Sequence, residues 1–96
     1  MLTRHEILHF LKQYKQEFAA RFSVRTIGLF GSFLHDNASE RSDIDILVTL
    51  EKPTFDHCMD LKFFLEDHLK RPVDLVIEDT VKPRLKPIIE REVEYA

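Results

Sequence analysis

The chain has 96 residues, of which 44% are hydrophobic and 32% charged, and its formal net charge is −3. This composition excludes a disordered chain, and the slightly acidic balance excludes the basic footprint of a nucleic-acid-binding domain. The length predicts one domain over residues 1–96, and the lone Cys58 excludes an internal disulfide. No apolar stretch is long enough to span a membrane, and the N-terminal residues lack the apolar region of a signal peptide. We therefore expect a cytoplasmic protein that contacts neither a membrane nor, directly, nucleic acid.

The apolar pattern alternates between helical and strand spacing along the chain. It predicts a helix over 4–21, a strand over 24–30, a short helical turn at 33–34, a strand over 43–50, a helix over 55–69, a strand over 72–78, a short helix within 83–93 and a short terminal strand over 93–96. Thr3, with Glu6 three residues later, is typical of a capping box for the first helix, and Pro87 is expected to weaken the last one. This order predicts an α/β fold in which a mixed sheet of about three to four strands is flanked by helices.

Two aspartates lie one residue apart inside the strand pattern "DIDILVTL". Side chains two residues apart on a strand share a face, about 6–7 Å apart along the chain. Asp43 and Asp45 are therefore expected to point the same way, while Ile44 and Ile46 enter the core. Two carboxylates that are held close and partly buried repel one another, and a divalent cation removes that conflict. Oxygen-only ligands favour Mg²⁺, with Mn²⁺ as a substitute, over zinc.

A third carboxylate and a glycine–serine pair complete the candidate site. Asp74 stands in the middle of the strand pattern "PVDLVIE", where strand propensity disfavours it, and it can reach the same face if the two strands are neighbours. Three acids could then hold two metal ions for an in-line displacement at phosphorus. Gly31 and Ser32 end the first predicted strand before a short turn. Backbone N–H groups, a serine hydroxyl and a missing Cβ at such a turn suit a phosphate group.

Ordinary structural roles would explain parts of this pattern. A Gly-Ser pair is a common turn, and Ser42 with Asp43 could cap a helix. A helix cap does not explain Asp45 followed by the strand-like "ILVTL", however, and no turn requires Asp74. The conjunction therefore favours a site for phosphate and metal over either structural role alone.

The pair Gly31-Ser32, followed after ten residues by Asp43-Ile44-Asp45, resembles the signature of the DNA polymerase β-like nucleotidyltransferase superfamily. "RPVDLV" with Asp74 resembles the third metal-ligand position, and the length resembles that of the minimal nucleotidyltransferase (MNT) branch. The resemblance implies a polymerase-β-palm-like fold that transfers a nucleoside monophosphate from a nucleoside triphosphate to a hydroxyl group and releases pyrophosphate. It implies catalytic and metal-binding roles for Asp43, Asp45 and Asp74. Nucleotide binding is implied for Gly31, Ser32, Asp43 and Asp45.

Many MNT proteins are encoded beside a HEPN-domain toxin and act as its antitoxin. The resemblance implies that this chain uses Mg²⁺ and ATP to adenylylate a tyrosine of such a toxin, within a hetero-oligomer. One departure bears on this, because many family members carry Arg-Gly where this chain has His35-Asp36. Two alternatives therefore stay open. The chain could neutralise its partner by binding alone, or it could serve as a nucleotidyltransferase subunit that modifies a small molecule or RNA.

The N-terminal segment "HEILH" matches the H-E-x-x-H pattern of zinc metalloproteases. Helical spacing places His5 and His9 opposite the apolar side that includes Ile7 and Leu11. A metalloprotease needs its histidine pair to face a cleft with a third ligand. We therefore interpret this pair as facing solvent rather than as a zinc site.

Overall fold

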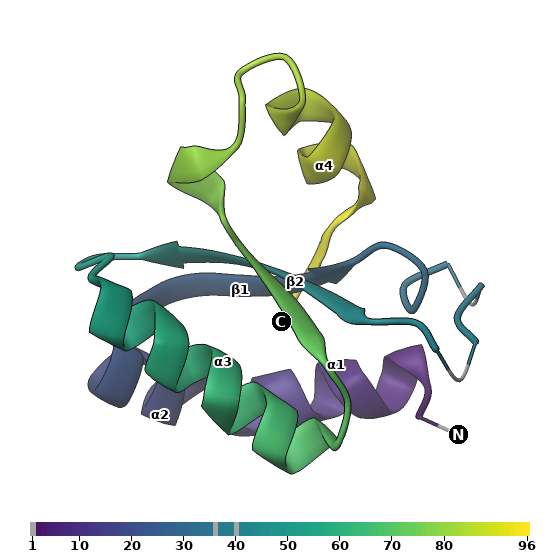
Figure 1. The fold of residues 1–96 in the computed structure, drawn as a ribbon, viewed down its shortest axis with the longest axis horizontal. Coiled ribbons are helices and arrows are strands. Elements are labelled where there is room, and N and C mark those ends of the chain that lie inside the picture. The colour runs from purple at the N-terminus through teal and green to yellow at the C-terminus, as the bar shows by residue number, and fades with distance from the viewer. Residues whose placement is uncertain (1, 36, 40) are drawn as a thin grey trace.

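The protein is built on a four-stranded mixed sheet that carries three helices on one face (Figure 1). The computed structural model describes residues 2–35, 37–39 and 41–96. Its elements are, in chain order, α1 (Arg4–Gln13), α2 (Lys15–Phe22), β1 (Val24–Phe30), β2 (Ile44–Leu50), α3 (Phe55–Leu69), β3 (Val73–Ile77), the 3₁₀ turn η1 (Glu78–Thr80), α4 (Lys86–Glu92) and β4 (Glu94–Tyr95). In Figure 1, α1, α2 and α3 cover one face of the sheet, and the segment with η1 and α4 rises from the other face. The predicted α/β fold with a mixed sheet is confirmed.

The strands are arranged in the order β3-β2-β1-β4. β1 pairs antiparallel with β2 along one edge and with β4 along the other. β3 runs parallel to β2, so the chain must cross over between them, and α3 forms that crossover. β2 therefore lies inside the sheet, where residues of both β1 and β3 are adjacent to it.

The predicted single helix over 4–21 is wrong, because the chain forms two helices that meet at Tyr14. Tyr14 leaves helical geometry with φ −100° and ψ 11°. Its ring packs 4.9 Å from the ring of Phe10 and 5.6 Å from the ring of Phe64 on α3, measured between centroids. Both helices keep buried side chains in the core, among them Leu11 and Phe18. The break allows α1 and α2 each to bury its own apolar side. The apolar period of the sequence continues through Tyr14 and so does not reveal the break.

The other boundaries follow local signals in the sequence. Thr54 caps α3, since its hydroxyl accepts a hydrogen bond from the N–H of His57, and the helix spans the predicted residues. β2 begins at Ile44, one residue later than predicted, so Asp43 lies just before the strand. Pro87 falls in the first turn of α4, where proline is tolerated, rather than in its middle. Within the described part of the chain, no helix has the length and apolarity needed to cross a membrane.

The main core lies between the sheet and the three helices α1, α2 and α3. Along β2, Ile44, Ile46 and Val48 are fully buried on this side. Strand alternation directs Asp45 and Leu47 to the opposite face of the sheet. Leu47 is 1% exposed there, whereas Asp45 is half-buried. The C-terminal segment therefore covers only part of this face and leaves the end with the acids partly open to solvent.

Candidate active site

Asp45 and Asp74 lie side by side on neighbouring strands. They are paired in the parallel register of β2 and β3, and their carboxyl groups are close enough for a hydrogen bond when one of them is protonated. A hydrogen bond between two carboxyl groups requires a proton on one of them, because an ionised carboxylate only accepts. The structure thus brings together two of the three predicted acids, on the face of the sheet opposite α1, α2 and α3.

Asp43 stands immediately before β2, at the same end of the sheet. Its side chain is exposed, and its charge acts on Asp45. The next residue, Ile44, donates its N–H to the carbonyl of Pro72 at 3.0 Å, which joins the start of β2 to the start of β3. The expectation that Asp43 and Asp45 lie on one strand is therefore corrected. Asp43 precedes the ladder, and its position depends on the loop that leads into β2.

The surroundings raise the pKa of Asp45 from 3.8 to about 6. Burial is the largest cause, followed by the negative charges of Asp74 and Asp43 and by the hydrogen bond with Asp74. All of these causes act against the ionised form. The site therefore holds more carboxylate than its protein surroundings neutralise, and a bound cation would relieve that excess.

Gly31 comes immediately after β1 and lies directly beside Asp45. The preceding residue, Phe30, pairs with Asp45 across the antiparallel ladder, and Gly31 has φ +77°, a conformation that favours glycine. A Cβ at Gly31 would lie 2.9 Å from Cγ of Asp45 and nearer still to its Oδ2. The half-exposed Ser32 follows in the turn. The predicted phosphate-binding pair thus lies next to the acids, where no side chain at residue 31 could fit.

His35 closes the turn that begins at Gly31. Its N–H donates to the carbonyl of Gly31 at 3.3 Å, as expected for a short helical turn. Its ring Nε2 lies 3.9 Å from Oε2 of Glu92 on α4, an ion pair when the histidine is protonated. Asp36, the second residue of the His35-Asp36 departure, lies outside the described residues. His35 therefore has a carboxylate neighbour of its own.

Two arginines that the sequence analysis did not single out hold the loops around this site. Arg4 of α1 donates from Nη1 to the carbonyl of Leu34 at 3.2 Å. Arg71, between α3 and β3, donates from Nη2 to the carbonyls of Ser39 at 3.0 Å and Ser42 at 2.7 Å. Arg71 lies just after the C-terminal end of α3, where the helix dipole favours a cation, whereas Arg4 is the first residue of α1. Only the folded structure shows where their guanidinium groups lie.

The donor set at this corner of the sheet fits a hard divalent cation such as Mg²⁺. Carboxylate oxygens are the ligands that such ions prefer, and Asp43, Asp45 and Asp74 supply them. The negative charges of Asp74 and Asp43 act on Asp45 at the same place and, after burial, raise its pKa. Among the residues that the structure describes, no group of three or more His, Cys, Asp or Glu side chains is arranged so that it could hold a metal ion. The fit therefore rests on donor chemistry and charge.

The histidine pair of the "HEILH" segment lies away from this site. His5 and His9 are both exposed on α1, opposite the buried Ile7 and Leu11. No third metal ligand joins them within the described ranges. The interpretation of this pair as facing solvent is confirmed.

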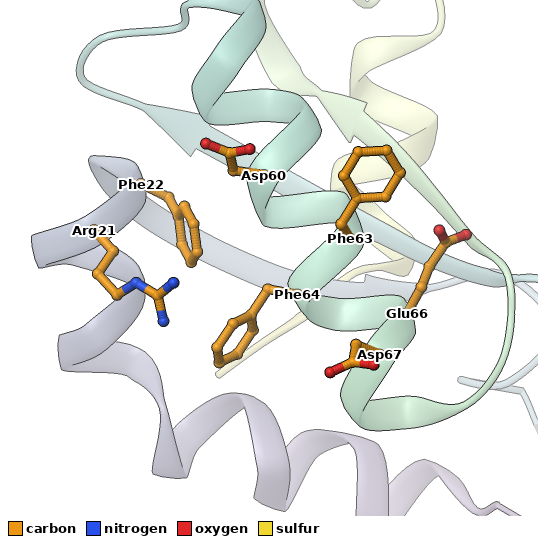
Figure 2. A pocket seen from close by; sticks show the side chains of 7 residues that line it. All are labelled: Arg21, Phe22, Asp60, Phe63, Phe64, Glu66 and Asp67. Carbon is orange, nitrogen blue, oxygen red and sulfur yellow. The ribbon is translucent and has the colours of Figure 1, made fainter.

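A shallow groove opens on the helical side of the molecule (Figure 2). It is lined by side chains of α2 and α3, namely Arg21, Phe22, Asp60, Phe63, Phe64, Glu66 and Asp67. The guanidinium carbon of Arg21 lies 5.0 Å from the ring centroid of Phe22 and 5.2 Å from that of Phe64. Phe63 is 57% exposed, so α3 does present an aromatic side chain to solvent. Because α3 packs on the face opposite Asp45, this groove is separate from the candidate active site.

Comparison with known protein families decides what kind of protein carries this site. The family model described as "Nucleotidyltransferase domain" matches residues 11–96. The chain belongs to this nucleotidyltransferase family. The matched range includes the Gly31-Ser32 turn and all three aspartates, and the resemblance seen in the sequence is confirmed.

Relatives of this nucleotidyltransferase match it over nearly its whole length. The protein adenylyltransferase MntA of Thermococcus cleftensis is 42% identical over 96 residues, covering 99% of this chain and 97% of its own. A solved structure described as "putative minimal nucleotidyltransferase" has a TM-score of 0.75 at 33% identity, covering 91% of this chain and 93% of that one. The polymerase-β-like fold of a minimal nucleotidyltransferase is thereby confirmed.

A more distant structure shares the fold. It belongs to a tri-AMPylated Shewanella oneidensis HEPN toxin in complex with an MNT antitoxin. The TM-score is 0.69 at 19% identity, and the match covers 97% of this chain and 71% of that one. At this level of identity the likeness shows the fold alone.

Proposed function

We propose that this nucleotidyltransferase is a Mg²⁺-dependent protein adenylyltransferase that transfers AMP from ATP to a tyrosine hydroxyl of a HEPN-domain toxin, and so acts as the antitoxin. One observation carries the proposal: Asp45 lies directly beside Gly31 and is paired with Asp74 on the neighbouring strand. We place the reaction in the cytoplasm, with toxin and antitoxin in one hetero-oligomer.

The turn and the acids have separate tasks in this proposal. The backbone at Gly31 and the hydroxyl of Ser32 bind the triphosphate, which can approach closely because residue 31 has no Cβ. Asp43, Asp45 and Asp74 would hold Mg²⁺, as two ions, with Mn²⁺ as a substitute. The bound metal supplies positive charge to the phosphate oxygens and to the leaving group.

The chemistry is an in-line displacement at the α-phosphorus of ATP. The tyrosine oxygen forms a new bond to phosphorus while the bond to the bridging oxygen of pyrophosphate breaks. Pyrophosphate leaves with the electron pair, and AMP stays on the tyrosine. Of the two paired acids, Asp74 is better placed than Asp45 to take the hydroxyl proton, because its side chain is exposed to an incoming acceptor while that of Asp45 is half-buried.

A protein acceptor is supported by the relatives rather than by the site itself. The Thermococcus cleftensis relative, which matches over nearly the whole of both chains, is named a protein adenylyltransferase. A chain of the same fold occurs in the complex with a tri-AMPylated HEPN toxin. These names favour a HEPN-domain protein as the acceptor over a small molecule or RNA.

The proposal is tested with the purified chain, a HEPN-domain protein from the same genome and ATP labelled on the α-phosphate. We expect label on a tyrosine of the HEPN protein in Mg²⁺, its loss in EDTA and its return with added Mn²⁺. Peptide mapping locates the label. Label on RNA or on a small molecule would instead identify a different acceptor.

A second candidate function is neutralisation of the same toxin by binding alone, without transfer of AMP. The observation that favours it is the pairing of His35 with Glu92, which gives this histidine a carboxylate neighbour in place of a phosphate. An Asp43→Asn variant separates the two functions. Full neutralisation of the toxin by this variant would favour binding alone, and loss of neutralisation would favour catalysis.

A further inference from the structure

Arg71 lies where the three segments of the candidate site meet. It follows α3 and stands three residues before Asp74 of β3. Its guanidinium group reaches the loop that ends at Asp43 and lies over the ring of Phe33, which comes directly after Ser32. The Arg71 side chain thus contacts the loop before Asp43 and the turn after Gly31. Its own backbone leads into β3, the strand that carries Asp74.

The contact with the loop before β2 is made through two backbone carbonyls. Nη2 of Arg71 donates to the carbonyl of Ser42 at 2.7 Å and to that of Ser39 at 3.0 Å. Hydrogen bonds from a charged donor are stronger than those between neutral groups. Ser42 is covalently joined to Asp43, so these bonds fix the backbone from which the Asp43 carboxylate extends.

The contact with the phosphate-binding turn is made through an aromatic ring. Cζ of Arg71 lies 5.2 Å from the ring centroid of Phe33, within the range of a cation–π interaction. Phe33 is 2% exposed, so its ring is held firmly in the core beneath the guanidinium group. This packing fixes the turn that carries Ser32.

Strand pairing alone does not fix these parts of the site. The ladders set Asp45 against Asp74, and Phe30, just before Gly31, against Asp45. Asp43 and Ser32 lie outside the paired residues of β1 and β2. Some other contact must therefore hold them relative to the sheet, and Arg71 contacts a direct neighbour of each.

We propose that Arg71 is a positioning residue for nucleotidyl transfer, which holds the phosphate-binding turn and the backbone before Asp43 in register with β3. The inference rests on the proposed roles of Ser32 and Asp43 at this site. Arg71 acts through these neighbours and touches neither the nucleotide nor the metal.

Two substitutions separate its two contacts. Arg71→Lys keeps a cation that can donate to the same carbonyls but lacks the planar face that lies over Phe33. We expect its KM for ATP to rise about tenfold, a typical loss for one such contact, while kcat stays near wild type. Arg71→Met loses both contacts, so we expect KM to rise and kcat also to fall by about tenfold or more.

The matched control is Arg84→Met, which removes an exposed arginine in the turn before α4. It should leave both kinetic constants unchanged. Hydrogen exchange supplies a readout that does not depend on turnover: amides of residues 37–39 and 41–43 should lose protection in Arg71→Met while those of β1 and β2 keep theirs. Isothermal titration of ATP with Mg²⁺ should show the same weakening as KM.

Two results would overturn the inference. One is an Arg71→Met protein with unchanged KM, kcat and loop protection. The other is a uniform loss of folded protein, in which apparent kcat falls but KM and ATP affinity stay at wild-type values in both variants. If the wild type modifies no HEPN partner, the proposed acceptor is wrong, but ATP affinity and loop exchange still test Arg71.

Discussion

The carboxylate of Asp45 occupies the space that a side chain at Gly31 would need. An added Cβ would lie 2.9 Å from Cγ of Asp45, and residue 31 also has φ +77°. The glycine of the proposed phosphate-binding turn and the half-buried acid of the neighbouring strand therefore constrain each other sterically. A change at either residue should affect both the acids and the turn.

Gly31→Ala should destabilise the protein and abolish transfer together. The positive φ is expected to cost about 1 to 3 kcal/mol of unfolding free energy, before any displacement of Asp45. Urea unfolding and titration with ATP and Mg²⁺ measure the two effects.

Gly28→Ala is the matched control for this prediction. Its Cβ would lie 2.6 Å from Cγ2 of Val93, so it strains the C-terminal segment but not the acids. We expect it to lower stability and to retain ATP binding. Normal ATP binding by Gly31→Ala would contradict the steric account.

Asp45→Asn should stabilise the metal-free protein at neutral pH. Because the folded-state pKa of Asp45 is raised from 3.8 to about 6, the folded state binds the proton more tightly than the unfolded state. The contribution of this group to stability therefore falls as pH rises from about 4 to 6 and stays low above that range. Asparagine does not titrate. The free energy of unfolding of Asp45→Asn should therefore rise above that of wild type over this pH range, by about 1 kcal/mol after allowing for solvent screening.

Urea unfolding in EDTA at several pH values between 4 and 7.5 measures this difference. Asp60→Asn, an exposed acid on α3, is the control and should behave like wild type. Equal stability of Asp45→Asn and wild type at every pH would show that the carboxyl pair carries no strain.

Asp74→Asn should lose transfer activity while the fold is kept. The amide can still donate to Asp45, so the contact between β2 and β3 survives, but a proposed metal ligand and proton acceptor is lost. We expect transfer to fall by at least about a hundredfold, since each role is worth several kcal/mol in the transition state. Asp79→Asn, in the exposed η1 turn, should keep full activity in the same assay. An active Asp74→Asn protein would remove this residue from the site.

The purified protein should carry no stoichiometric zinc. His5 and His9 are exposed on α1, and no third ligand stands beside them in the described residues. Elemental analysis of wild type and of a His5→Ala, His9→Ala variant tests this. Zinc present in the first at one ion per chain and absent in the second would restore the zinc hypothesis.

Much of the site could be predicted because its signals are local. A glycine at the end of β1 and acids in strands where acids are unfavourable are visible in the sequence. The parallel pairing that sets Asp45 beside Asp74 also follows from a helix between two strands. These features specify the acids and the turn without any knowledge of distant contacts.

The parts that could not be predicted depend on long-range packing. At the break, Tyr14 packs against Phe64, fifty residues away in the chain. The role of Arg71 depends on carbonyls that only the folded loop brings within reach. Sequence spacing likewise placed Asp43 on the strand, although the ladder begins one residue later.

The central claim is that these aspartates serve the transfer of AMP to a partner protein. The most direct measurement is the intact mass of the HEPN-domain protein after co-expression with this chain, as wild type and as Asp43→Asn. The account predicts one or more added AMP groups with the wild type and none with the variant. An unmodified partner that forms an equally tight complex with both versions would contradict it.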